Sequence, residues 1–136
     1  MTQQRVYLSG GFRSNWQDEV ISKLGTKFIF TNPRTHELDD SNQYWAWDMH
    51  YVKWCDIVFA YMDEDNPSGY GLALEVGLAY GLQKTIILID NRSPVDPKFQ
   101  SYFKIVHGCA SVILRSLDEG IEYLRKFDIS LDAEVH

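Results

Sequence analysis

The chain has 136 residues, of which 45% are hydrophobic and 24% charged. This length and composition predict one folded domain and exclude a disordered or collagen-like chain. With 19 acidic and 13 basic side chains, the net charge of -6 disfavours a nucleic acid polymer as partner. The chain shows no apolar run long enough to span a membrane and no signal-like start, so we expect a cytoplasmic protein without a membrane partner.

Short β-prone runs alternate with helical patterns along the chain. Strands are expected at residues 5–9, 28–30, 56–62, 85–89 and 110–114, and helices at residues 16–24, 43–55, 72–82 and 117–127. Ser41 is expected to cap the second helix. The alternation predicts an α/β fold: a single-domain flavodoxin-like (Rossmann-like) parallel five-stranded sheet, order 2-1-3-4-5, with helices on both faces. The domain is expected to span residues 1–128, and residues 129–136 to form an acidic tail.

In such a sheet, ligands bind beyond the carboxyl ends of the strands where the strand order reverses. This rule places residues 9–13 and 63–75 around one crevice. Glu75 follows the turn at residues 69–71 by about one helical turn, where free amides favour an ionised carboxylate. Acidic residues are common at helix starts for structural reasons, but the apolar neighbours of Glu75 favour a functional carboxylate.

Asp48 interrupts a mainly apolar helix face formed by Tyr44, Val52 and Cys55. Burying an unpaired charge is costly, so Asp48 must either bond to local amides or a lysine, or lie in a polar cavity. Both arrangements remain open. Cys55 and Cys109 have apolar neighbours and are interpreted as reduced cysteines, so neither a metal nor a cofactor is expected.

Three segments in this order are typical of one enzyme family. They are residues 6–12 (VYLSGGF), then Asp48 with Val52 and Asp56 before an apolar strand, then residues 69–80 (GYGLALEVGLAY). On these motifs the chain resembles the nucleoside 2-deoxyribosyltransferase family and its N-glycosidase relatives. The resemblance spans residues 6–90, about two thirds of the chain.

The resemblance implies a role for each of three residues. Glu75 matches the nucleophile that attacks the anomeric carbon and forms a covalent glycosyl-enzyme. Tyr7 matches the residue that positions this glutamate, and Asp48 the residue that contacts the sugar or helps to protonate the departing base. A retaining displacement of this kind uses two acidic groups about 5 Å apart, which Glu75 and Asp48 could supply.

The family's substrate-binding positions match a larger set of residues here. They are Gly10, Gly11, Phe12, Arg13, Ser68, Gly69 and Gly71. The family's transferases often carry an aspartate six residues before the nucleophile, where this chain has Gly69. Relatives that hydrolyse nucleoside monophosphates tend to have a serine near that place and an arginine in the first glycine turn, which Ser68 and Arg13 match loosely.

We therefore expect cleavage of a 2′-deoxynucleoside with transfer of the deoxyribosyl group to another nucleobase. The alternatives are a 2′-deoxynucleoside 5′-monophosphate N-glycosidase and a non-catalytic nucleotide-binding module. The expected partners are a small nucleoside or nucleotide, a free nucleobase and, as the resemblance implies, further copies of the chain. The aromatic residues between 44 and 54 could stack on a base or wall the pocket, but rings at helical spacing are more often part of a core or a subunit interface, and we expect an interface for most of them.

Overall fold

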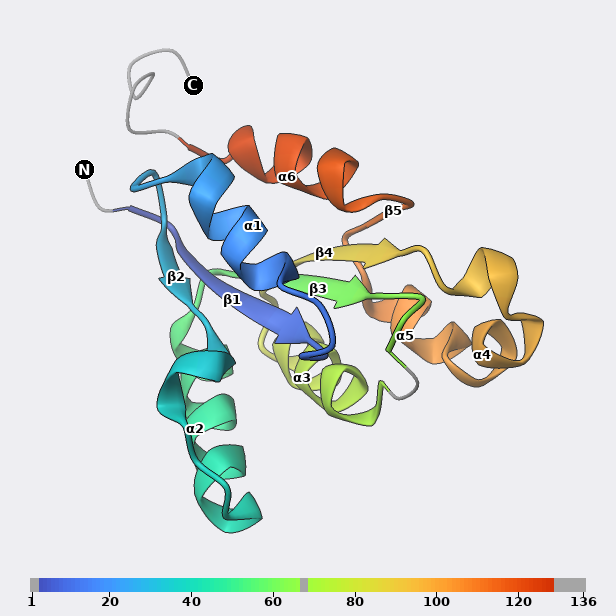
Figure 1. The fold of residues 1–136 in the computed structure, drawn as a ribbon, viewed down its shortest axis with the longest axis horizontal. Coiled ribbons are helices and arrows are strands. Elements are labelled where there is room, and N and C mark those ends of the chain that lie inside the picture. The colour runs from blue at the N-terminus through green and yellow to red at the C-terminus, as the bar shows by residue number, and fades with distance from the viewer. Residues whose placement is uncertain (1–2, 67–68, 129–136) are drawn as a thin grey trace.

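The computed structural model describes residues 3–66 and 69–128. Its centre is a parallel five-stranded sheet in the order β2-β1-β3-β4-β5, which confirms the predicted topology (Figure 1). The strands are β1 (Arg5–Gly10), β2 (Ile29–Thr31), β3 (Ile57–Met62), β4 (Thr85–Asp90) and β5 (Val112–Leu114). The order reverses between β1 and β3, so the carboxyl ends of these two strands flank the expected crevice.

Helices cover both faces of the sheet (Figure 1). One face carries α1 (Trp16–Leu24) and α6 (Leu117–Arg125). The other carries α2 (Ser41–Trp54), α3 (Tyr70–Gly81), α4 (Pro97–Tyr102) and α5 (Lys104–Cys109). Two short 3-10 helices, η1 (Pro33–His36) and η2 (Ser93–Val95), follow β2 and β4. In the described part of the chain, no helix is both long and apolar enough to cross a bilayer.

Alternating strand residues supply two separate cores. Val6 and Leu8 pack with α1 and α6, whereas Tyr7 packs on the other face with α2 and α3. All six residues of β3 are buried, as expected for a strand covered on both faces. Because side chains alternate along a strand, Ser9 lies on the same face as Tyr7. Both side chains therefore point towards the helices that carry Asp48 and Glu75.

Two local features differ from the expectations. Asp40, not Ser41, caps α2, because its carboxylate accepts the backbone N–H of Asn42 at 2.8 Å. The helices α4 and α5 were not expected from the sequence, because each has only 6 residues and shows no extended period. Tertiary contacts stabilise both helices, because Phe99 of α4 and Val106 of α5 are buried in the core under α3.

Two helical glycines allow a matched test of packing in this fold. A Cβ at Gly120 would lie 2.6 Å from the buried Ile89 side chain, whereas a Cβ at Gly77 would meet nothing within 4 Å. Alanine favours a helix over glycine, so Gly77→Ala should raise the free energy of unfolding by up to about 1 kcal/mol. Gly120→Ala should lower it by about 1 kcal/mol or more through overpacking. Urea denaturation measures both, and equal shifts would contradict the packing described.

Candidate active site

The carboxylate of Glu75 is the most constrained charged group at the β1–β3 crevice. Glu75 lies in the second turn of α3, and only 6% of the residue is exposed. The hydroxyl of Tyr7 donates to Glu75 Oε2 at 2.6 Å, and the hydroxyl of Ser9 donates to Oε1 at 2.6 Å. Two side chains of β1 therefore orient one carboxylate from α3.

The electrostatic setting of Glu75 differs from the one expected. Burial raises the pKa of Glu75, the hydrogen bonds from Ser9 and Tyr7 lower it, and the charge of Asp48 raises it; together they give a pKa of about 7. In place of the helix-start amides that were expected, the hydroxyl groups of Tyr7 and Ser9 donate to the two oxygens of Glu75. Near neutral pH this carboxyl group exchanges a proton, which is a property of catalytic carboxyls.

Tyr7 is fully buried beneath this carboxyl group. Burial and the neighbouring charge of Glu75 raise the pKa of Tyr7 far above its ordinary value. The phenol therefore keeps its proton at physiological pH and serves as a permanent hydrogen-bond donor. This geometry matches the positioning role that the resemblance implies.

Asp48 faces the same crevice from α2. The residue is only 9% exposed, and among the described residues its Oδ1 has no hydrogen-bond partner. His36 Nε2 lies 3.7 Å from this oxygen. Burial raises the pKa of Asp48, whereas His36 and the Tyr7 hydroxyl lower it. Of the two arrangements left open above, the structure shows a carboxyl group in a cavity, not one bonded to amides or lysine.

Glu75, Asp48 and His36 line a cavity of about 420 Å³, within the range of small-molecule sites. Its lining comes from the loops after β1 and β2 and from α2 and α3: Gly10, Gly11, Phe12, Pro33, His36, Leu38, Tyr44, Trp45, Asp48, Gly71, Leu72 and Glu75. Apolar and aromatic walls thus surround two carboxyl groups. Such walls suit a flat ring with a polar attachment.

Four of the expected binding residues, Gly10, Gly11, Phe12 and Gly71, line this cavity, whereas two others that the structure describes do not. Arg13 is exposed and takes no part in the lining, because the turn after β1 directs it outwards. Gly69 is buried against the ring of Phe103 instead. Ser68 lies outside the described residues.

Gly10 allows the turn after β1 to pass close to its neighbours. A Cβ at this position would lie 2.8 Å from the backbone oxygen of Tyr61 and 2.8 Å from the ring of Trp16. The next carbonyl, that of Gly11, accepts hydrogen bonds from the side chains of Trp16 and Gln17. The turn is therefore held tightly, and Gly11 and Phe12 are presented to the cavity.

Three functional candidates were missed from the sequence. Ser9 was expected at the crevice but not beside Glu75. Its two-residue spacing from Tyr7 places both side chains on one face of the strand, and this could have predicted the contact. His36 comes from the loop after β2, where no periodicity exists to orient a side chain. Arg34 lies over the ring of Phe12 at 4.9 Å and bonds to Gln17, so it is the arginine that supports the first turn.

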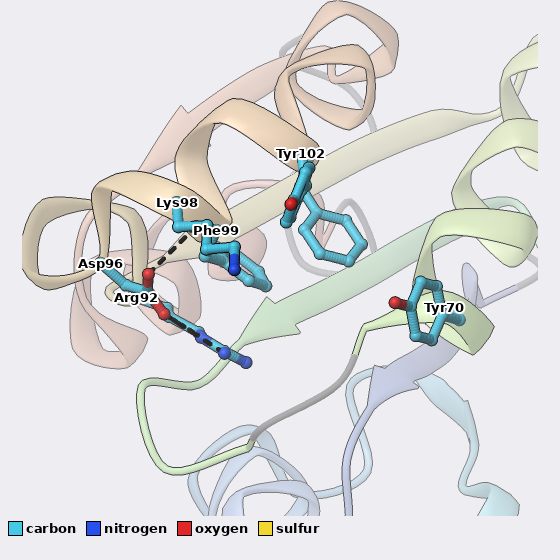
Figure 2. A pocket seen from close by; sticks show the side chains of 7 residues that line it. Tyr70, Arg92, Asp96, Lys98, Phe99 and Tyr102 are labelled. Atoms are coloured by element: carbon cyan, nitrogen blue, oxygen red, sulfur yellow. Dashed lines mark hydrogen bonds and ion pairs between the residues drawn. The ribbon is translucent and has the colours of Figure 1, made fainter.

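A second cavity, of about 200 Å³, lies between the start of α3 and helix α4 (Figure 2). Arg92 pairs with Asp96 at 3.3 Å and lies 4.2 Å from the ring centre of Phe99. The backbone N–H of Phe99 and the side chain of Arg92 lower the pKa of Asp96. The arrangement links η2 to α4 and holds no buried carboxyl comparable to Glu75.

The Glu75 carboxyl group accepts two hydrogen bonds at the topological switch point of a flavodoxin-like sheet. This arrangement is typical of an enzyme site in an α/β protein. Comparisons with known proteins specify the class. The sequence profile described as "Nucleoside 2-deoxyribosyltransferase like" matches residues 3–93. The chain therefore belongs to the nucleoside 2-deoxyribosyltransferase-like family. No protein with a curated description matches the sequence.

Two solved structures share the fold. The 2-desoxiribosyltransferase from Leishmania mexicana aligns with a TM-score of 0.72 at 16% identity, over 90% of this chain and 97% of that one. The Clostridium botulinum CMP N-glycosidase BcmB aligns with a TM-score of 0.60 at 20% identity, over 91% of this chain and 99% of that one. At these identities the similarity is one of fold.

The buried carboxyl group predicts a pH-dependent stability. The pKa of Glu75 is about 7 in the folded protein and 4.5 in the unfolded chain, so ionisation favours unfolding as the pH rises between these values. Relative to Glu75→Gln, the wild type should lose roughly 3 kcal/mol of unfolding free energy from below pH 4.5 to above pH 7. Denaturation at several pH values measures this, with the exposed Glu122→Gln as control. Parallel curves for wild type and Glu75→Gln would refute the burial described.

Proposed function

We propose that the protein cleaves the N-glycosidic bond of a 2′-deoxynucleoside and transfers the deoxyribosyl group to another nucleobase, with Glu75 as nucleophile. The observation that carries this proposal is the buried Glu75 carboxyl group, held by Tyr7 and Ser9 at 2.6 Å each, in an aromatic-walled cavity with a second carboxyl group. Family membership supports the reaction class.

In the first half-reaction, ionised Glu75 attacks C1′ of the sugar. The C1′–N bond breaks, its electron pair goes to the base nitrogen, and a bond forms between C1′ and a Glu75 oxygen. The departing base takes up a proton from Asp48, whose pKa is raised by burial. Tyr7 and Ser9 hold the attacking carboxylate in one orientation, which lowers the entropic cost of the attack.

The second half-reaction reverses the first with a new base. A ring nitrogen of the acceptor base attacks C1′, the ester bond to Glu75 breaks, and the proton lost by the base returns to Asp48. At the end of the cycle Glu75 is again ionised and Asp48 again protonated. If water attacks C1′ in place of the base, the ester bond breaks in the same way, the proton from water goes to Asp48, and the product is the free sugar.

The charges at the cavity favour an uncharged nucleoside as donor. Among its described lining residues the cavity has two carboxyl groups and neither lysine nor arginine. A phosphate group would meet repulsion from ionised Glu75 without a basic side chain to offset it. Arg13, which matches the monophosphate enzymes loosely, is exposed and does not line the cavity, and this also favours the uncharged donor.

One observation favours the monophosphate N-glycosidase as second candidate. The start of α3 lies at the cavity through Gly71, and the free amides of a helix start attract anions. The similar fold of a CMP N-glycosidase agrees with this candidate. The two functions separate by substrate: a monophosphate enzyme loses activity when the phosphate is removed.

The direct test is base exchange. Deoxyinosine or thymidine is incubated with a second free base, and the exchanged nucleoside is quantified by chromatography. Wild type and Glu122→Gln should form it, whereas Glu75→Gln should lose about 10³-fold or more in rate. Free sugar without exchange would indicate hydrolysis. Nucleoside binding that Glu75→Gln leaves unchanged, without any product, would indicate a binding module and refute the proposal.

The covalent step has its own readout. With a slowly turned-over 2′-fluoro donor, the peptide containing Glu75 should gain the mass of one glycosyl group, and Glu75→Gln should gain none. An active enzyme whose peptide never carries the sugar would contradict the nucleophilic role of Glu75.

The pH dependence of exchange provides a further test. Because Glu75 must be ionised to attack, kcat/KM should rise with pH through about 7. The Tyr7 hydroxyl lowers the pKa of Glu75, so Tyr7→Phe should move this rise to higher pH. Tyr61→Phe is the matched control, because the Tyr61 hydroxyl bonds to Asn91 instead. A rise at the same pH in wild type and Tyr7→Phe would exclude Tyr7 as the residue that tunes Glu75.

A further inference from the structure

Asp48 Oδ1 is a buried acceptor that has no hydrogen bond among the described residues. This oxygen has almost no accessible surface, so neither solvent nor a ligand in the cavity reaches it. In the described ranges, the basic side chain next to it is that of His36, and no lysine or arginine pairs with Asp48. Leaving a buried acceptor unpaired is unfavourable, and the cost rises once the group is ionised. An ionised Asp48 therefore requires a donor from the protein itself.

His36 holds such a donor next to this oxygen. Its Nδ1 accepts the backbone N–H of Leu38 at 2.8 Å, so the neutral ring carries its proton on Nε2. The ring lies parallel to Tyr44 and edge-on to Trp47, which fixes its direction. Nε2 is 3.7 Å from Asp48 Oδ1, about 0.8 Å beyond the usual N–H···O distance. Ordered atoms move by about 0.5–0.9 Å in thermal motion, so a small shift of either side chain closes this gap.

Two further groups face Asp48, and neither offers it a donor. Tyr7 of β1 acts on the charge of Asp48, but its one hydroxyl proton goes to Glu75 at 2.6 Å. Glu75 of α3 is ionised when it attacks, so its charge opposes a charge on Asp48. Among the described residues, the Nε2–H of His36 is therefore the donor left for an ionised Asp48. The side chain of His36 accordingly lowers the pKa of Asp48.

We propose that His36 is a positioning residue that acts through Asp48: its Nε2–H donates a hydrogen bond to Asp48 Oδ1 as Asp48 gives its proton to the departing base. The proton moves from Asp48 to the base nitrogen, and His36 keeps its own proton throughout. When the acceptor base returns a proton to Asp48, the hydrogen bond lengthens again. A charge-assisted bond of this kind stabilises the developing carboxylate and makes Asp48 a stronger proton donor. The inference rests on the proposed function, because it takes Asp48 as the general acid.

Two substitutions separate the donor from the rest of the ring. His36→Asn places an amide oxygen where Nδ1 accepts from Leu38, but its short side chain has no donor at the position of Nε2. His36→Gln places an amide N–H near that position. Both variants lose the ring packing, so a difference between them reports the donor. His50→Asn, at an exposed histidine of α2, is the control and should behave as wild type. Thermal unfolding shows whether each variant is folded.

Two substrates distinguish proton delivery from binding. A 2′-deoxynucleoside releases a base that needs a proton, whereas 4-nitrophenyl 2-deoxyriboside releases a phenolate that needs none. Release of each leaving group is measured in a single turnover. His36→Asn should slow release from the nucleoside about 10-fold or more and stay within about 3-fold of wild type on the phenyl substrate. His36→Gln should recover part of the loss. Equal losses on both substrates would overturn the inference.

Asp48→Asn tests whether His36 acts through Asp48. This variant should show the same dependence on the leaving group. His36→Asn combined with Asp48→Asn should lose no more activity than Asp48→Asn alone, because the carboxylate that His36 stabilises is already absent. Losses that multiply would show that His36 acts elsewhere, and the inference would be wrong.

Failure of the proposed function gives a different result. The wild type would then release no base from any nucleoside, but the hydrogen bond is still measurable without a substrate. Carbon NMR follows the ionisation of the Asp48 carboxyl group in Glu75→Gln, which removes the neighbouring carboxyl group. In this background His36→Asn should raise the pKa of Asp48, and His36→Gln should raise it less. An Asp48 pKa that neither substitution changes would refute the inference with or without catalysis.

Discussion

The structure depends on one balance, between the burial of the Glu75 carboxyl group and the two hydroxyl groups that bond to it. Burial alone would leave this group protonated and unreactive over most of the physiological range. Tyr7 and Ser9 each donate at 2.6 Å and lower the pKa, and the outcome is a value of about 7. The group can therefore be ionised in a site that largely excludes water, where charge has its strongest effect.

The topology of the sheet makes this balance possible. Crossovers leave β1 and β3 adjacent with helices on both faces, so alternate residues of β1 point to opposite cores. Val6 and Leu8 fill one core, while Tyr7 and Ser9 reach the side where α2 and α3 meet. A one-residue shift in β1 would remove both hydroxyl donors and put Val6 and Leu8, or Leu8 and Gly10, in their places.

The aromatic residues of α2 divide by their position around the helix. Tyr44 and Trp45 line the cavity, whereas Trp47 and Tyr51 pack against the core, and Trp54 lies beneath the Arg5 guanidinium at 4.7 Å. These five rings thus have partners within the chain, and association into a homo-oligomer stays a prediction. The ring of His36, from η1, contacts both Tyr44 and Trp47 of α2. It therefore touches one ring that lines the cavity and one that packs against the core.

The sequence by itself predicted the strand order, because residue alternation and helix periodicity are local signals. The switch-point rule placed Glu75 at the crevice, whereas the roles of Tyr7 and Asp48 came from the resemblance to the family. Only the tertiary structure decided the pKa of Glu75, the choice of Arg34 over Arg13 beside Phe12, and the meeting of His36 with Asp48. Each of these depends on burial or on contact between segments distant in the chain, and neither quantity is encoded in local periodicity.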